Sequence, residues 1–304
     1  MFYAYIIVMA QKIREMRPMD KDFPTILREI PWPPKSINIW SKNGKLPKAK
    51  YFLSVVGTRR NSAYGEEILR KIIAGLAPYG FGTVSGMALG IDTVAAKASL
   101  ECNMPTIAVL GSGLASEAFY PPRNWRIAEE IVEKGGAIIS EYDKDMKATL
   151  WSFPQRNRII SGLAPATLVV EAPERSGALI TAKFALDQNR DVLAVPGSAF
   201  STNSKGTNKL IKQGAALIES AEDVLRAYGI DSGKSDRATG GSDFQDLNLS
   251  PEEKQIFDSL IEPMDIDSLI RKSKMASNAA QAIIGLMEIR GIIKKLGSEY
   301  VRQI

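Results

Sequence analysis

The sequence contains no histidine and a single cysteine, Cys102. Histidine is the commonest general base near neutral pH, and histidine and cysteine are the usual ligands of zinc. The sequence therefore predicts neither a zinc site nor a thiol–histidine nucleophile, and we expect no metal and no cofactor. A lone cysteine cannot form a disulfide within the chain, which is typical of proteins of the reducing cytoplasm.

Long hydrophobic runs are also missing. The apolar stretch at residues 1–10 is too short to span a membrane, and its basic residues follow it, whereas those of a signal peptide come first. We expect this stretch to form a short strand or helix packed on the main domain. No membrane partner is expected.

The excess of positive charge is small, since 39 Lys and Arg against 34 Asp and Glu give a net charge of +5. A nucleic-acid site would therefore have to be a local basic cluster. Arg156 and Arg158 form such a cluster, three and five residues after Phe153. Arginines two positions apart cannot share a helix face, so we expect one to point to a ligand and the other toward the fold. Guanidinium groups beside an aromatic ring suit single-stranded nucleic acid, because its backbone is anionic and its bases stack.

Short apolar runs alternate with helical patterns from residue 51 onward. This alternation predicts a parallel sheet with helices on both faces, that is, a Rossmann-like doubly wound α/β domain at residues 51–226, preceded by an N-terminal extension at 1–50. Ligands of such sheets bind outside the carboxyl ends of the strands. The predicted strands are 53–56, 82–85, 106–110, 137–140, 167–171 and 192–195.

Glycine turns follow several of these strands, at residues 57–59, 85–90, 111–113 and 176–178. Each can present backbone N–H groups to an anion. None completes a GxGxxG or GxxxxGK[ST] pattern, so neither a dinucleotide cofactor nor a P-loop site is supported. The nearest carboxylates, Asp92 and Glu171, are expected to make structural hydrogen bonds. Without a GxSxG elbow or a histidine, no catalytic residue is predicted.

The C-terminal part reads as a flexible linker followed by a small domain. Residues 227–248 are polar and rich in glycine. In residues 249–304, Ser250 is expected to cap a helix, further helices are expected at 265–272 and 277–289, and residues 292–301 alternate as a hairpin. This order predicts a winged helix. Its net charge is 8 − 8 = 0, and its expected recognition helix carries only Glu288 as a charge. A protein-contact role is therefore favoured over strong DNA binding.

The order of the motifs resembles the DNA-processing protein A family, also called DprA or Smf. The resemblance covers residues 23–226 and rests on the blocks 56–59, 62–65, 85–92, 108–113, 120–121, 153–163, 169–172, 176–182, 194–197 and 204–215. It implies a non-catalytic homodimer that binds single-stranded DNA during natural transformation, protects the incoming DNA and helps to load the RecA recombinase. Three departures are the missing histidine at 96–97, an N-terminal part too short for the sterile-alpha-motif domain of many members, and a loop at 143–151 that is usually rich in proline and glycine.

The resemblance also implies a binding site. Arg59, Arg156 and Asn157 would line the DNA pocket, Phe153 would lie beside a base, and glycine backbones would approach phosphate. The expected contact residues are Gly57, Thr58, Arg59, Ser85, Gly86, Phe153, Arg156, Asn157, Arg158, Ser176 and Gly177. Whether the neighbouring loop joins this site is left open for Lys144, Lys147 and Trp151.

A second class of function competes with this one. Glycine loops at the edge of a Rossmann-like sheet also bind small phosphorylated ligands, so an enzyme or sensor for a nucleotide or nucleoside phosphate is the alternative. Arg156 and Arg158 fit either function. The enzyme would need a catalytic acid or base that the sequence does not offer. The linker and the winged helix favour the single-strand binder.

Overall fold

The computed structural model describes residues 13–230, 249–260, 262–296 and 299–302. The chain divides into two compact units, Met1–Lys234 and Ser235–Ile304. The apolar stretch at 1–10 and residues 231–248 of the expected linker lie outside the described residues. The first unit holds all the expected contact residues.

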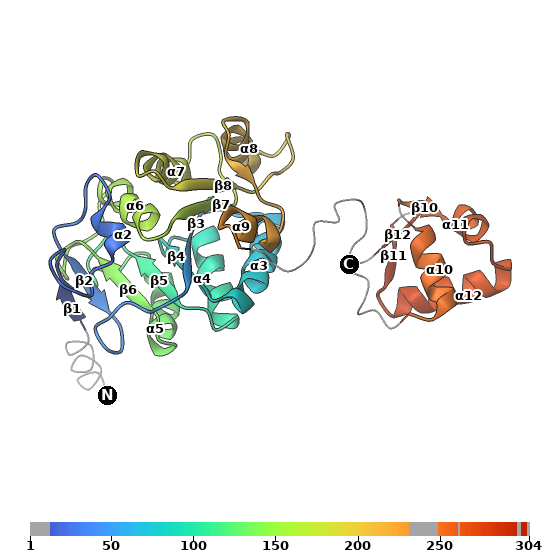
Figure 1. Cartoon of the computed structure of the whole chain (residues 1–304), viewed down its shortest axis with the longest axis horizontal. Helices are drawn as coiled ribbons and strands as arrows, with labels where there is room; N and C mark the ends of the chain where they lie inside the picture. Colours follow the sequence, from blue (N-terminus) through green and yellow to red (C-terminus); the bar gives the residue numbers. More distant parts are fainter. Residues whose placement is uncertain (1–12, 231–248, 261, 297–298, 303–304) are drawn as a thin grey trace. The chain divides into compact units, whose positions relative to one another are not determined.

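A nine-stranded sheet forms the centre of the first unit (Figure 1). The strand order is β1-β2-β6-β5-β4-β3-β7-β8-β9. In this spatial order, all neighbours from β6 through β5, β4, β3, β7 and β8 to β9 pair in parallel. At the other edge, β1 pairs antiparallel with β2, and β2 pairs antiparallel with β6. The strands are β1 (Ile13–Met16), β2 (Ile37–Trp40), β3 (Tyr51–Val56), β4 (Phe81–Ser85), β5 (Thr106–Val109), β6 (Ala137–Ser140), β7 (Ala166–Val169), β8 (Asp191–Ala194) and β9 (Ala216–Leu217).

All six predicted strands are confirmed, and the mostly parallel α/β sheet is the one that the alternating pattern predicts. The prediction did not include β1 and β2. Residues 13–50, expected as an extension, contribute both strands to the main sheet. Each has only four residues, and Ile-Arg-Glu-Met in β1 lacks the regular alternation that identifies a strand. Pairing of β1 with β2, which in turn pairs with β6, decides its conformation instead.

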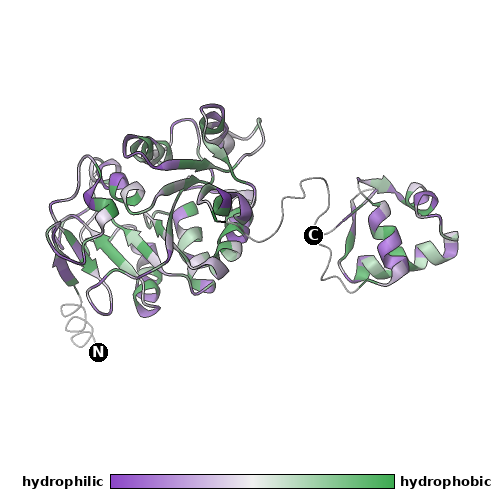
Figure 2. Ribbon diagram, viewed as in Figure 1, coloured by the Kyte–Doolittle hydropathy of each residue, from purple (hydrophilic) through white to green (hydrophobic). Residues whose placement is uncertain are grey.

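Helices cover both faces of the sheet, and alternate residues of a strand face opposite cores. In β3, Leu53 and Val55 pack with α3, α4 and α9, while Val56 packs with α6 and α7. The central strands are correspondingly apolar, drawn green in Figure 2, whereas β1 at the edge is largely hydrophilic. None of the helices in the described ranges is long and apolar enough to cross a membrane. The helices are α2 (Thr25–Arg28), α3 (Ala63–Leu76), α4 (Ile91–Glu101), α5 (Trp125–Glu133), α6 (Ser152–Gly162), α7 (Gly177–Asp187), α8 (Lys205–Lys212) and α9 (Ala221–Ala227).

The second unit has a core of its own, which includes Ile256, Phe257 and Ile284. Ser250 caps its first helix as expected: its hydroxyl accepts from the N–H of Glu253, and the Glu253 carboxylate accepts from the N–H of Ser250. The three expected helices and the hairpin are present. The elements are α10 (Pro251–Ser259), β10 (Met264–Asp265), α11 (Ile266–Ser273), α12 (Ser277–Ile289), β11 (Ile293–Leu296) and β12 (Glu299–Arg302), with sheet order β10-β12-β11.

Candidate functional site

A cleft opens where the strand order of the sheet reverses. β3 lies between β4 and β7, so the connections that follow β3 and β7 lead away from each other and leave a crevice at the carboxyl ends of the strands. The cleft has a volume of about 490 Å³. It is lined by loops after β3 and β7 and by α6. Eight of the expected contact residues line it: Gly57, Thr58, Arg59, Phe153, Arg156, Asn157, Ser176 and Gly177. A ninth, Gly86, lines a small adjoining pocket.

Arg59 and Phe153 meet at the mouth of the cleft. The guanidinium carbon of Arg59 lies 5.4 Å from the centroid of the Phe153 ring, a cation–π distance. The ring of Tyr120 is 5.5 Å from that of Phe153, tilted by 56°. Arg59 is exposed and has no ion pair with any carboxylate in the part of the chain that the structure describes. Its N–H groups thus remain available to an anion beside two aromatic rings.

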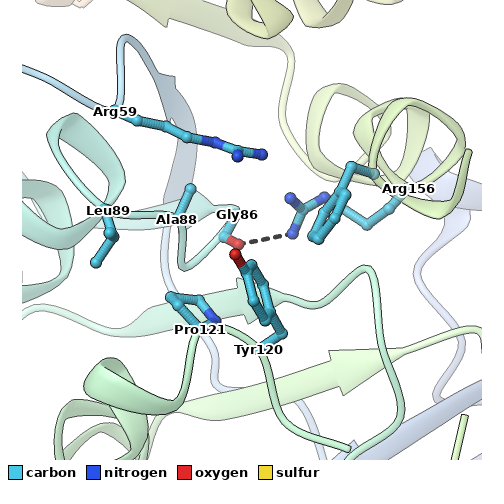
Figure 3. Close-up of a pocket in the computed structure, with 8 residues that line it drawn as sticks. Arg59, Gly86, Ala88, Leu89, Tyr120, Pro121 and Arg156 are labelled. Carbon is cyan, nitrogen blue, oxygen red and sulfur yellow. Dashed lines mark hydrogen bonds between the residues drawn. The ribbon is translucent and has the colours of Figure 1, made fainter. Parts of the chain in front are cut away.

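Arg156 lies on the floor of the cleft and is 4% exposed. Its Nη1 donates to the carbonyl oxygen of Gly86, at the end of β4, at 2.7 Å (Figure 3). It also donates to the carbonyl oxygen of Val109 at the end of β5. Arg156 thus lines the cleft from a buried position, because strand-end carbonyls engage its guanidinium. Figure 3 shows this guanidinium and that of Arg59 directed toward the same space. Burial lowers the pKa of Arg156, and the nearby Asp92 carboxylate opposes that shift.

Asp92 shapes the loop after β4. Its Oδ2 accepts hydrogen bonds from the N–H groups of Gly86, at 3.1 Å, and Ala88, at 3.3 Å. Burial raises the pKa of Asp92 to about 6, although Arg156 acts in the opposite direction. A Cβ on Gly86 would lie 2.6 Å from Asp92 Oδ2 and 2.8 Å from Arg156 Nη2, so only glycine fits between these two groups.

The other acidic residue singled out in the sequence, Glu171, is also engaged within the fold. Its carboxylate accepts from the N–H of Ser62 at 2.8 Å and from the Ser62 hydroxyl at 2.6 Å. It thereby ties the end of β7 to the start of α3. Both carboxylates make the structural hydrogen bonds expected of them.

Asn157 connects α6 with α7. Its Oδ1 accepts from Arg156 Nε at 3.3 Å, and its Nδ2 donates to the carbonyl oxygen of Gly177 at 3.3 Å. The Ser176 hydroxyl accepts from the N–H of Ala178 and caps α7. This arrangement places the start of α7 against the cleft, where backbone N–H groups favour an anion.

Two expected contact residues do not line these cavities. Arg158 forms a bidentate pair with Glu141, at 2.7 and 2.6 Å, and both side chains are largely buried. This pair fixes the chain ahead of α6. Ser85 is buried at the end of β4.

Several residues that line the cleft were not predicted from the sequence: Tyr120, Leu150, Arg175 and Ile180. Arg175 had a usable signal, because it is a cation directly before Ser176 in a glycine loop that follows a strand. Tyr120 had none beyond its place in a motif, and Leu150, 93% exposed, sits in an irregular loop.

The loop before α6 contributes to a second groove of about 580 Å³, which shares Tyr120, Leu150 and Phe153 with the cleft and is also lined by Lys147. The other two residues of that loop left open by the sequence lie outside both cavities. Lys144 is 3.9 Å from Asp145, and Trp151 packs its edge against Tyr142.

Comparison with known proteins identifies the family of this chain. Residues 15–229 match the sequence profile of the DNA recombination-mediator protein A family. The chain belongs to this family. It is 48% identical over 173 residues to protein Smf of Escherichia coli, a match that covers 57% of this chain and 46% of that protein. It is 35% identical over 324 residues to protein Smf of Synechocystis, covering 95% of this chain and 80% of that one.

Solved structures of the DprA family share the fold. DNA processing protein A from Streptococcus pneumoniae superposes with a TM-score of 0.64 at 37% identity, covering 74% of this chain and 77% of that one. The Helicobacter pylori protein, whose structure concerns its single-stranded DNA binding mode, superposes with a TM-score of 0.62 at 27% identity, covering 71% and 95%.

Proposed function

We propose that this DprA-family chain binds single-stranded DNA in the cleft after β3 and β7 and acts as a non-catalytic recombination mediator. The observation that carries the proposal is the pair formed by Arg59 and Phe153. A cation–π contact leaves the edge of a guanidinium free, so Arg59 can hold a phosphate while a base stacks against the Phe153 ring. A single strand offers both groups in every nucleotide.

The surroundings of this pair support the proposal. Arg175 adds a second exposed cation to the lining, and the Ser176–Gly177 segment begins the eleven-residue helix α7. A Cβ at Gly177 would meet no atom within 4 Å, so its backbone is open to approach by a phosphate. Arg156 contributes positive charge from below, with the N–H groups of its Nη1 already engaged by carbonyl oxygens.

A non-catalytic role fits the chemistry of the cleft. Asp92 Oδ2 accepts from two backbone N–H groups, and both carboxylate oxygens of Glu171 accept from Ser62. A general base needs a lone pair within reach of the substrate proton. Protection of incoming DNA, loading of RecA, dimerisation and a cytoplasmic location are proposed from membership of the family.

We further propose that the second unit is a winged helix that contacts protein. Three helices followed by the β11–β12 hairpin support the fold. On α12, the helix that would read a DNA groove, Leu286 is 55% and Ile289 84% exposed. Asn278 and Gln281 are its exposed amide side chains. Apolar groups at that position suit a protein surface better than phosphates and base edges.

Fluorescence anisotropy with labelled oligonucleotides tests the DNA proposal. We expect tighter binding of a single strand than of the matching duplex, and affinity that falls as salt rises. A mononucleotide competitor should displace the strand only weakly. Displacement at low micromolar mononucleotide would instead support a nucleotide sensor, and equal affinity for duplex would contradict the single-strand proposal.

A further inference from the structure

The loop between β8 and α8 carries an aromatic side chain at its tip. Phe200 is 97% exposed. Its backbone lies in a turn in which the N–H of Ser201 donates to the carbonyl oxygen of Ser198 at 3.0 Å, and the N–H of Phe200 donates to the Ser198 hydroxyl at 3.3 Å. One exposed apolar residue is ordinary on a protein surface. Phe200 differs in that its loop is hydrogen-bonded to the loops that form the cleft.

The stem of this loop is tied to the loops that form the cleft. Asn203 Nδ2 donates to the carbonyl oxygen of Arg60 at 2.9 Å, in the loop after β3. The carbonyl oxygen of Asn203 accepts from the N–H of Ala172 at 2.7 Å, in the loop after β7. Because β3, β7 and β8 are parallel, the loops that follow them all leave the sheet at the carboxyl ends of its strands (Figure 1). The hydrogen bonds of Asn203 therefore hold the loop that carries Phe200 next to the loops of the cleft.

Positive charge continues from the cleft toward this loop. Arg60 follows Arg59, Arg175 lines the cleft, and Lys205 begins α8. All three are exposed, and within the described ranges none forms an ion pair with a carboxylate. The exposed acids nearby are Glu174, in the loop after β7, and Glu219, whose charge acts on Tyr64 beside Pro196. Three cations against two acids leave a positive surplus that favours an anionic chain along the carboxyl ends of β7 and β8.

We propose that a DNA single strand held in the cleft continues along the carboxyl ends of β7 and β8. There a base stacks on Phe200, and phosphates pass Arg60 and Lys205. This inference rests on the proposed function. It extends the arrangement of Arg59 and Phe153, since Phe200 is again an aromatic ring at the carboxyl ends of strands where exposed cations occur. The occupant is the same DNA strand, because continuity with the cleft and the sign of the charge both match its backbone.

Oligonucleotides of two lengths test the proposal. One of about 4 nucleotides would fill the cleft alone, and one of about 12 would reach past it. Phe200→Ala should weaken binding of the long oligonucleotide about tenfold and leave binding of the short one unchanged. Phe200→Trp should retain the affinity of the unaltered protein. Arg60→Ala and Lys205→Ala should each reduce the salt slope by about 0.7 for the long oligonucleotide only.

Trp32→Ala is the matched control, since Trp32 is 64% exposed and outside both cavities. If Phe200→Ala binds both lengths like the unaltered protein, the extended path is wrong while the cleft stands. If the unaltered protein binds neither length, the proposed function itself fails. Sedimentation without DNA separates a third case: a changed oligomeric state in Phe200→Ala would show that Phe200 contacts another copy of the chain, which overturns the DNA path.

Discussion

The guanidinium of Arg156 donates to the carbonyl oxygen of Gly86 at 2.7 Å, which joins α6 to the end of β4. This bond, with its companion to Val109, explains why an arginine in a DNA-binding family is almost fully buried. Arg156 both positions the floor of the cleft and places a positive charge under it. The two roles can be separated by experiment.

Arg156→Ala should destabilise the first unit by about 3–5 kcal/mol, because it leaves the carbonyl oxygens of Gly86 and Val109 without this donor and removes the positive charge near the buried Asp92. Urea unfolding followed by tryptophan fluorescence measures this, since Trp32, Trp40, Trp125 and Trp151 all lie in the first unit. Arg59→Ala, at an exposed position, should change stability by no more than about 0.5 kcal/mol. Equal stability of both variants would contradict a structural role for Arg156.

Arg59→Ala should weaken single-strand binding and reduce the salt slope by about 0.7, because one phosphate contact is lost. Anisotropy titrations at several salt concentrations give both quantities. Arg17→Ala serves as the control, because Arg17 is exposed and follows β1 at the far edge of the sheet. An unchanged slope in Arg59→Ala would mean that this guanidinium does not meet a phosphate.

Phe153→Ala should cost about 1–3 kcal/mol of binding free energy if a base stacks on the ring. The neighbouring Trp151→Ala is a suitable comparison, since Trp151 is 58% exposed but lines neither cavity. Affinity is measured by anisotropy, and stability by urea unfolding of the same samples. A variant that loses stability while it keeps its affinity would show that Phe153 serves packing alone.

The parallel sheet could be predicted because its strands are apolar runs separated by glycine turns. The carboxyl ends of parallel strands lie on one side of the sheet, which predicts that Gly57, Arg59 and Gly177 lie close together. The positions of the two arginine side chains of α6 do not follow from the strand pattern. They depend on which acceptors lie nearby: Arg158 donates to Glu141, and Arg156 donates to strand-end carbonyl oxygens. Such long-range partners are set by packing and leave no local pattern.

The same limit applies to the edge of the sheet and to irregular loops. β1 reads as polar, and its place beside β2 follows from pairing with a strand more than twenty residues later. Tyr120 and Leu150 enter the cleft from loops whose course depends on tertiary contacts, as when Ser152 Oγ donates to the Gly111 carbonyl oxygen at 2.6 Å.

The titration of Asp92 gives a prediction with a definite sign. Its pKa is raised from 3.8 to about 6 in the folded chain, so the folded state binds more protons than the unfolded state between these values. The Asp92 contribution to stability is therefore fully present below pH 3.8 and is lost as the pH rises through about 6. The loss amounts to about 3 kcal/mol, at 1.36 kcal/mol for each pKa unit.

Asp92→Asn isolates this effect, because asparagine keeps an acceptor for Gly86 and Ala88 but does not titrate. Urea unfolding of both proteins from pH 4 to pH 7 gives the difference in their free energies of unfolding and cancels the other titrating groups. The unaltered protein should lose about 3 kcal/mol relative to the variant over this range. If the unaltered protein instead gained stability relative to the variant as the pH rises, the positive charge of Arg156 would outweigh burial and hold the Asp92 pKa below its ordinary value.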